Sequence, residues 1–167
     1  MKRLIWPALA GATAMAAGAS LALTAWLDLH PCHLCIFQRL LFMLLVVLAG
    51  IAVLGRSRVV VLGVGGLFVS IALGGMTVAA YQSWLQWQPA GSITCANGPP
   101  GTIERFVEWL GQLQPELFLA TGFCEDKELT LFGLSLANLA FLTYLACVAL
   151  ALVAIKHGIS NSREHKQ

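Results

Sequence analysis

The stretch from residue 30 to residue 54 reads HPCHLCIFQRLLFMLLVVLAGIAVL, and it joins a Cys-x-x-Cys pair to a long apolar run. A run of about 20 apolar residues is long enough for a helix to cross a lipid bilayer. Between Ile36 and Gly55 the run contains one charged residue, Arg39. The stretch therefore predicts a membrane-spanning helix over about residues 36–54, with the two cysteines at its start.

The rest of the chain is also poor in charge. Only 11% of its 167 residues are charged, against about 25% in soluble domains. No charged residue occurs in three further stretches, 4–27, 59–103 and 129–155. We expect four membrane spans, at about 5–27, 36–54, 59–81 and 130–155. The fold class is then an all-α membrane protein, a four-transmembrane-helix bundle in which residues 1–167 form a single membrane domain.

The positive charges cluster at three places outside the predicted spans. They are Lys2 with Arg3, Arg56 with Arg58, and Lys156 with Arg163 and Lys166. Because cytoplasmic loops of membrane proteins carry an excess of Lys and Arg, we expect all three clusters in the cytoplasm. Both termini and the 55–58 link are then cytoplasmic. The loops at about 28–35 and 82–129 lie outside, which in a bacterium is the periplasm.

The N-terminus also has features of a cleavable signal peptide. Lys2 and Arg3 precede an apolar run, and Ala17-Gly18-Ala19 is a small-residue triplet of the kind found at cleavage sites. The run continues to Leu27, however, which is longer than a signal core. Cleavage would also leave three spans and break the agreement with the charge rule, so we interpret the segment as a membrane span.

Two patterns predict which helix faces pack and which meet the membrane surface. Small residues recur every four positions at Ala10, Ala14 and Gly18, and again at Gly66, Ser70 and Gly74. We expect both sets to be packing faces, because small side chains let helices approach closely in lipid. Tryptophans near the span ends are expected to be interfacial anchors: Trp6, Trp26, Trp84 and Trp87.

The long outer loop holds a candidate helix and two of the cysteines. Turn-forming residues at 88–91 and 97–101 exclude regular structure around Cys95, which we expect to be exposed. Over 103–113 the apolar residues fall on one helical face, with charged residues elsewhere. This pattern predicts a short amphipathic helix that lies on the membrane surface. Cys124 follows it, close to the start of the fourth span.

The Cys32 and Cys35 pair predicts redox chemistry. Unpaired N–H groups and the helix dipole stabilise a thiolate in the first turn of a helix, and Arg39 adds a positive charge on the same face. A disulfide across two residues constrains almost no chain, so a structural staple explains the pair poorly. A haem site needs CxxCH, but Ile36 follows Cys35. A zinc site is disfavoured because His33 lies between the cysteines, so we expect no metal and no haem.

Four of the five cysteines lie on the predicted outer side, which allows three pairings. Proximity favours Cys32 with Cys35. Cys95 with Cys124 would close a loop of about 30 residues, either as a redox pair or as a staple that stabilises the fold by roughly 3–4 kcal/mol. Cys147, inside the fourth span, is interpreted as a small apolar residue.

Arg39 has two compatible interpretations. A positive charge inside a membrane helix is costly and usually functional. Near a span end, an arginine also commonly extends its side chain to the interface. Both interpretations place the Arg39 guanidinium close to the Cys-x-x-Cys pair.

The order of these motifs resembles the disulfide bond formation protein B (DsbB) family of bacterial inner membranes. CHLCIFQR at 32–39 is similar to the family's Cys-x-x-Cys followed by Arg at the head of the second span. Thr94-Cys95 and Gly122-Phe123-Cys124 resemble the two cysteines of its second periplasmic loop. Two segments between them match as well, FVEWL at 106–110 and FLATG at 118–122. The resemblance covers the chain from about residue 27 to residue 136.

The resemblance implies a four-helix bundle that oxidises a periplasmic thiol oxidase of the DsbA type and passes the electrons to a membrane quinone, ubiquinone or menaquinone. It implies no nucleic acid partner. The redox-active disulfides would be Cys32–Cys35 and Cys95–Cys124. Cys95 would form the mixed disulfide with the partner, Cys124 would attack Cys32, and Cys35 would be released facing the quinone. Arg39 would bind beside a quinone carbonyl, so Arg39→Ala should weaken quinone use while leaving the fold intact.

The chain departs from the family pattern at one place. After Tyr81 it has no histidine or acidic residue before Cys95, where some relatives carry them. This departure weakens the case for a quinone contact from that segment.

Three alternatives stay open. The first is a membrane thiol enzyme resembling vitamin K epoxide reductase, although its Cys-x-x-Cys belongs late in the chain and here it comes early. The second is a non-enzymatic tetraspan protein whose cysteines only staple its outer loops. The third is a DsbB-like oxidase that serves a dedicated partner instead of a DsbA-like protein.

Overall fold

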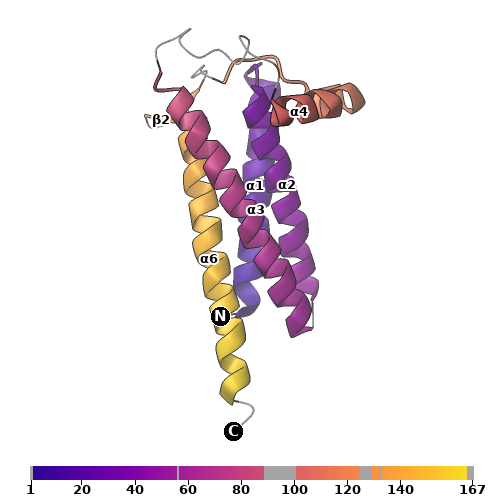
Figure 1. The fold of residues 1–167 in the computed structure, drawn as a ribbon, viewed down its shortest axis with the longest axis vertical. Coiled ribbons are helices and arrows are strands. Elements are labelled where there is room, and N and C mark those ends of the chain that lie inside the picture. The colour runs from indigo at the N-terminus through magenta and orange to yellow at the C-terminus, as the bar shows by residue number, and fades with distance from the viewer. Residues whose placement is uncertain (1, 56, 89–100, 125–128, 132, 165–167) are drawn as a thin grey trace.

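Four long helices form a bundle. The computed structural model describes residues 2–55, 57–88, 101–124, 129–131 and 133–164. The long helices are α1 (Lys2–Trp26), α2 (His33–Leu54), α3 (Arg58–Leu85) and α6 (Leu136–Glu164). Each contains an apolar stretch of 21 to 27 residues that is long enough to cross a membrane. Helices α1 and α3 each pack against both α2 and α6 (Figure 1). The chain is therefore a multi-pass membrane protein with the predicted four-helix fold.

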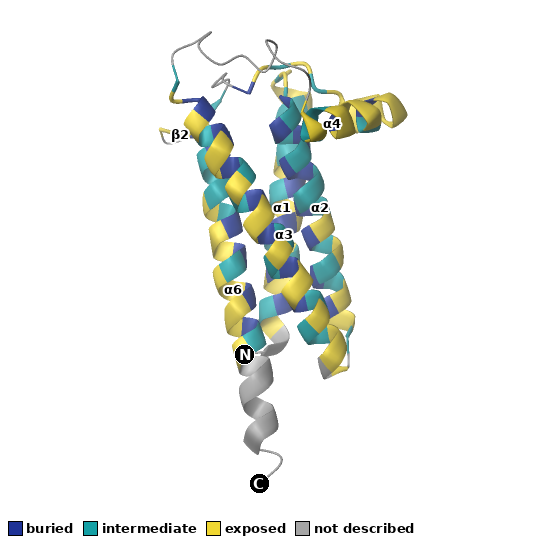
Figure 2. Ribbon diagram, in the orientation of Figure 1, coloured by how far each residue is buried: buried dark blue, intermediate teal, exposed yellow. Residues whose placement is uncertain are grey.

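Aromatic side chains fill the middle of the bundle. The rings of Phe42 and Tyr144 stack with their centroids 4.2 Å apart, and Trp6 packs edge-on against Phe68 at 5.8 Å. The Tyr144 hydroxyl donates a hydrogen bond to the backbone carbonyl of Gln38 at 3.0 Å, which ties α6 to α2. Figure 2 shows buried positions alternating with exposed ones along each helix. The exposed apolar side chains form the surface that a membrane-spanning bundle presents to lipid.

The prediction of the packing faces was wrong. Most of the small residues expected to pack are exposed, namely Ala14, Gly18, Gly66, Ser70 and Gly74. Their neighbours Ala17 and Gly75 are buried instead. The face of α3 that turns inward carries Phe68 and a neighbouring set of small residues, Gly65, Ala72, Gly75 and Ala79. Gly75 there lets α3 approach the buried Tyr144 ring of α6. Trp6 belongs to this core and is only 7% exposed, so it is not an interfacial anchor.

Short elements cover one end of the bundle, which we call the α4 end. The predicted amphipathic helix is α4 (Thr102–Leu113), which lies across the bundle axis (Figure 1) and is followed by α5 (Pro115–Phe118). A two-residue antiparallel pair, β1 (Thr130–Leu131) with β2 (Leu134–Ser135), precedes α6. The fourth long helix therefore begins at Leu136, later than the expected residue 130. The reason is a turn at Gly133, whose φ of +80° is readily adopted only by glycine.

We predict that Gly75→Ala destabilises the bundle. A methyl group at Gly75 would overlap the buried Tyr144 ring, whereas one at the adjacent Gly74 would meet no atom within 4 Å. Overpacking of this kind costs about 1–3 kcal/mol. Thermal unfolding in detergent should show a lower midpoint for Gly75→Ala than for Gly74→Ala, which gains the same helix propensity. Equal midpoints would contradict the packing described here.

Candidate active site

Cys32 and Cys35 lie at the start of α2, at the α4 end of the bundle. Cys32 is the N-cap residue, and its Sγ accepts a hydrogen bond from the Cys35 backbone N–H at 3.4 Å. The two residues carry thiols whose sulfurs are 3.0 Å apart. The extended backbone of the cap turns the Cys32 side chain back over the first helical turn, where Cys35 lies. A pair held this way can exchange between dithiol and disulfide with little backbone movement.

The segment before α6 brings Cys124 to the same place. The backbone N–H groups of Thr121 and Gly122 donate to the Pro31 carbonyl at 3.0 and 3.3 Å. A side chain at Gly122 would collide with the backbone carbonyl of His30, so this close approach requires glycine. Cys124 itself is only 4% exposed and belongs to a small buried cluster at the head of α2.

Cys32 lies between two sulfurs. Its hydrogen bonds with Cys124 and with Cys35, together with burial, raise the pKa of the Cys32 thiol above its ordinary value. A thiol with a raised pKa is a poor leaving group, so attack on the Cys32–Cys35 disulfide favours expulsion of Cys35. The structure thus brings together three of the four candidate cysteines. Cys95 lies outside the described residues, and its pairing with Cys124 stays a prediction.

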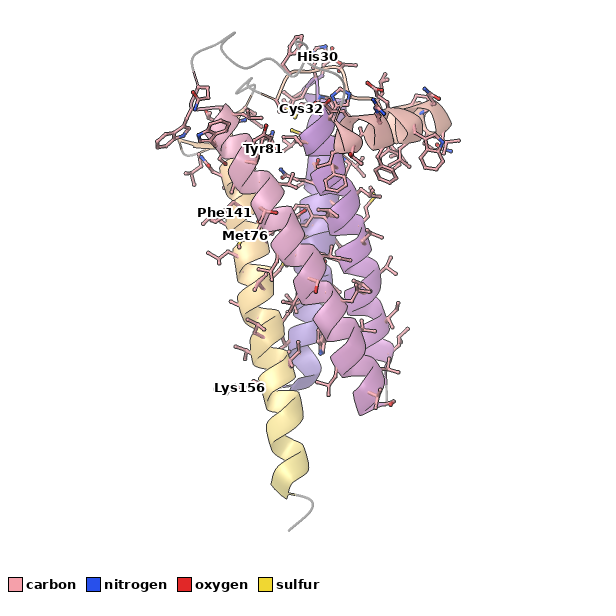
Figure 3. All side chains as sticks on the ribbon, in the orientation of Figure 1. His30, Cys32, Met76, Tyr81, Phe141 and Lys156 are labelled. Carbon is pink, nitrogen blue, oxygen red and sulfur yellow. The ribbon has the colours of Figure 1, made fainter. Side chains whose placement is uncertain are left out.

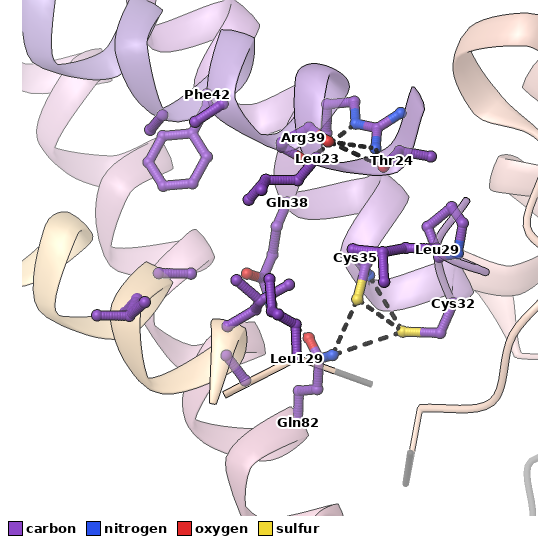
Figure 4. Close-up of a pocket in the computed structure, with 18 of the residues that line it drawn as sticks. Leu23, Thr24, Leu29, Cys32, Cys35, Gln38, Arg39, Phe42, Gln82 and Leu129 are labelled. Carbon is purple, nitrogen blue, oxygen red and sulfur yellow. Dashed lines mark hydrogen bonds between the residues drawn. The ribbon is translucent and has the colours of Figure 1, made fainter. Parts of the chain in front are cut away.

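One buried glutamine, Gln82, contacts the cysteine pair, and a second, Gln38, contacts Gln82. The Gln82 side-chain amide in α3 donates from Nε2 to Cys35 Sγ at 3.0 Å and to Cys32 Sγ at 3.5 Å (Figure 4). Gln38 in α2 donates from its own Nε2 to Gln82 Oε1 at 2.8 Å. Sequence reasoning missed both residues. The available signal was their position, because Gln38 lies within the predicted second span and Gln82 directly follows the predicted third span. A polar side chain in a membrane helix needs a hydrogen-bonding partner.

Arg39 is buried near the α4 end of the bundle, with 3% of its surface exposed. Its guanidinium donates to Ser20 and Thr24 in α1, with bonds of 3.1 and 3.3 Å to the hydroxyl and carbonyl of Ser20 and 2.7 Å to Thr24 Oγ1. A further bond of 3.0 Å reaches the Leu117 carbonyl in α5. All these acceptors are uncharged, and no carboxylate within the described ranges pairs with Arg39. Its charge is therefore held in place without being neutralised.

A cavity of about 260 Å³ lies beside the two sulfurs. Figure 4 shows Cys35, Gln38, Arg39 and Gln82 around it. Apolar residues from α1 and α6 form much of the remaining lining: Ala16, Ala19, Leu23, Leu136, Ala137, Leu139 and Ala140. A cavity of about 150 Å³ suffices for benzene, so this one has room for a substituted ring. Gln82 and Gln86 both line the cavity. The segment after Tyr81 therefore contributes to it, although the sequence offered no histidine or acidic residue there for a quinone contact.

Helix α4 is attached to the head of α2 and keeps an apolar surface free. Val107 is fully buried. Glu108 Oε1 lies 3.8 Å from Nε2 of His33, the residue that directly follows Cys32. Phe106, Trp109 and Leu113 are 41%, 54% and 57% exposed. Figure 3 shows the aromatic side chains of this helix projecting from it, away from the bundle core. This exposure is that of a helix which lies in a membrane interface.

The chain is similar to a known protein family. The model of the family "Disulfide bond formation protein DsbB" matches residues 2–154. Disulfide bond formation protein B of Dechloromonas aromatica (strain RCB) is 43% identical over 138 residues, which cover 80% of this chain and 79% of that protein. Its counterpart in Polaromonas sp. (strain JS666 / ATCC BAA-500) is 39% identical, over 76% of this chain and 74% of that protein. The chain therefore belongs to the DsbB family of membrane oxidoreductases that act in disulfide bond formation.

Proposed function

We propose that this protein oxidises a DsbA-like thiol oxidase in the bacterial periplasm and passes the electrons to a membrane quinone. One observation carries the proposal: the sulfurs of Cys32, Cys35 and Cys124 meet beside a cavity that contains a buried, unneutralised arginine. The cluster provides a path for thiol–disulfide exchange. The cavity provides a place for an acceptor next to the last sulfur of that path.

The proposed relay begins at the outer loop. A thiolate of the reduced partner attacks Cys95 of the Cys95–Cys124 disulfide, forms the mixed disulfide with Cys95 and releases Cys124 as a thiolate. The second thiol of the partner then attacks the partner's own sulfur in the mixed disulfide. This step releases Cys95 as a thiolate and completes the disulfide of the oxidised partner. Cys124 is already next to Cys32 and can attack it, which breaks the Cys32–Cys35 bond and releases Cys35 as a thiolate. The resulting Cys32–Cys124 disulfide is resolved when Cys95 attacks Cys124, which restores the outer disulfide and frees Cys32.

The cavity fits a quinone. Arg39 and Gln38 offer N–H groups and charge near Cys35, and the apolar lining from α1 and α6 suits an uncharged ring. A quinone held by these residues would supply a two-electron acceptor for the Cys32–Cys35 dithiol, which would return to a disulfide with the loss of two protons. Arg39 favours negative charge on Cys35 because it has no carboxylate partner among the described residues. Burial excludes water from the reacting sulfurs, which strengthens these electrostatic effects.

The proposed orientation puts the α4 end of the bundle in the periplasm. Both termini and the 55–58 link would then face the cytoplasm, with the protein in the bacterial inner membrane. The exposed side chains of Phe106, Trp109 and Leu113 would rest on the outer surface of the bilayer. This placement keeps the sulfur cluster at the depth of the quinone head group while the loop that contains Cys95 faces the partner.

We predict that purified protein reduces quinone when it is supplied with reduced DsbA, and that Cys95→Ser abolishes this activity because the partner then has no disulfide to attack. Ultraviolet absorbance of the quinone is the measurement. Cys147→Ala is the control, because Cys147 lies in the core of the bundle, outside the sulfur cluster, and should retain turnover. Absence of quinone reduction by folded wild-type protein with both disulfides formed would argue for a structural tetraspan protein or a dedicated partner.

We predict that removing the charge of Arg39 weakens quinone use. Arg39→Met should lower kcat/KM for quinone by about tenfold or more, equal to about 1.4 kcal/mol of transition-state stabilisation. Arg39→Lys should retain more activity because it keeps the charge. Both variants should also unfold at a lower temperature, since the arginine binds α1 and α5. This replaces the expectation that Arg39→Ala leaves the fold intact. Equal quinone kinetics in Arg39→Met and wild type would remove Arg39 from the site.

A further inference from the structure

We propose that Gln82 stabilises the Cys35 thiolate through its side-chain amide, and that Gln38 positions Gln82 for this role. The inference rests on the proposed function, because it concerns the exchange step in which Cys35 is released. Gln82 lies in α3 and Gln38 lies in α2, outside the Cys-x-x-Cys pair, and neither residue carries a charge.

The contact that carries this inference is short, and both glutamine side chains are buried. Gln82 Nε2 is 3.0 Å from Cys35 Sγ, which is the shorter of its two sulfur contacts. The side chains of Gln82 and Gln38 are 3% and 5% exposed. Hydrogen bonds to charged groups are about twice as strong as neutral ones, and the low dielectric of a buried site strengthens them further. An amide donor in this position therefore favours the thiolate over the thiol.

The orientation of the Gln82 amide is set by Gln38. An amide has a donor end and an acceptor end, and a thiolate can only accept. Gln38 Nε2 donates to Gln82 Oε1 at 2.8 Å, which uses the acceptor end and leaves the N–H groups for the sulfurs. Tyr144 in α6 donates to the Gln38 backbone carbonyl, which ties this turn of α2 to α6. The donor that faces Cys35 is thus oriented by the side chain of Gln38.

The exchange step shows where this donor acts. When the Cys124 thiolate attacks Cys32, a Cys124–Cys32 bond forms and the Cys32–Cys35 bond breaks. The electron pair of the broken bond and the negative charge go to the Cys35 sulfur. The Arg39 guanidinium is bonded to α1 and α5, so its charge acts on that sulfur through space. Gln82 is the side chain from α3 that contacts the sulfur directly.

The first test measures the ionisation of Cys35. In full-length protein with Cys35 as its only cysteine, the rate of alkylation by iodoacetamide is followed against pH for wild-type Gln82, Gln82→Met and Gln82→Glu. Without the donor, the midpoint, which is the pH at which the alkylation rate reaches half its maximum, should rise by about one unit or more. Below that pH, a rise of one unit means about a tenfold smaller fraction of thiolate. Ser83→Ala is the matched control, because the buried Ser83 hydroxyl has no hydrogen-bond partner in the described part of the chain. It should leave the midpoint unchanged.

The second test measures the redox equilibrium of the pair. The protein for this test carries Cys95→Ser and Cys124→Ser, and the measured quantity is the equilibrium constant for reduction of the Cys32–Cys35 disulfide by glutathione. Gln82→Met should lower this constant by about tenfold or more, because the reduced form loses its stabilisation. Gln38→Met should cause a smaller change of the same sign. A Gln82→Met protein with wild-type midpoint and equilibrium would overturn the inference.

Gln82→Glu guards against a failure of Gln82→Met to fold. It keeps the shape of the side chain and the bond from Gln38, but its ionised carboxylate can only accept hydrogen bonds. At pH values where the carboxylate is ionised, the midpoint must therefore shift in the same direction. An unshifted midpoint in folded Gln82→Glu would equally overturn the inference. Neither test uses quinone or a protein partner. A missing effect of Gln82 is therefore distinguishable from a missing quinone reductase activity.

Discussion

A buried positive charge without a negative partner is the constraint on which the rest of the site depends. Arg39 lies in a membrane-spanning helix, and its hydrogen bonds to α1 and α5 all end on uncharged oxygens. Desolvating a charge is expensive, so these bonds hold three elements together around it. They also leave the charge able to attract an anion. A thiolate at Cys35, one helical turn away, is such an anion, and the fold thereby favours the charge separation that exchange requires.

The sulfur atoms are arranged so that exchange has a direction. Cys32 is buried between two other sulfurs, and its raised pKa makes it a poor leaving group. Cys35 faces the cavity and receives the Gln82 donor. Cys124 approaches from the outer loop, where glycine at position 122 allows the backbone to reach His30. In the proposed relay the negative charge therefore moves inward, from the loop toward the cavity.

Sequence patterns were sufficient for the helices and for the place of the cysteine pair. Long uncharged runs predict membrane helices because the bilayer sets their length, and a Cys-x-x-Cys at the head of such a run must lie at its first turn. Contacts between helices were much harder to predict. Gln82 is 47 residues from Cys35 along the chain, and only the rotation of α3 about its axis brings it to the sulfurs. The expectation about small residues was wrong for a related reason, because α3 carries small residues on two faces and the sequence does not say which one turns inward.

The account is tested most directly by whether Cys32 and Cys124 bond to each other. A Cys35→Ser/Cys95→Ser variant keeps both thiols, and mild oxidation in detergent followed by mass spectrometry of unreduced peptides identifies the bonds formed. The account predicts an intramolecular Cys32–Cys124 disulfide. Recovery of both cysteines as thiols, or only of bonds between molecules, would contradict the claim that electrons pass between these two sulfurs.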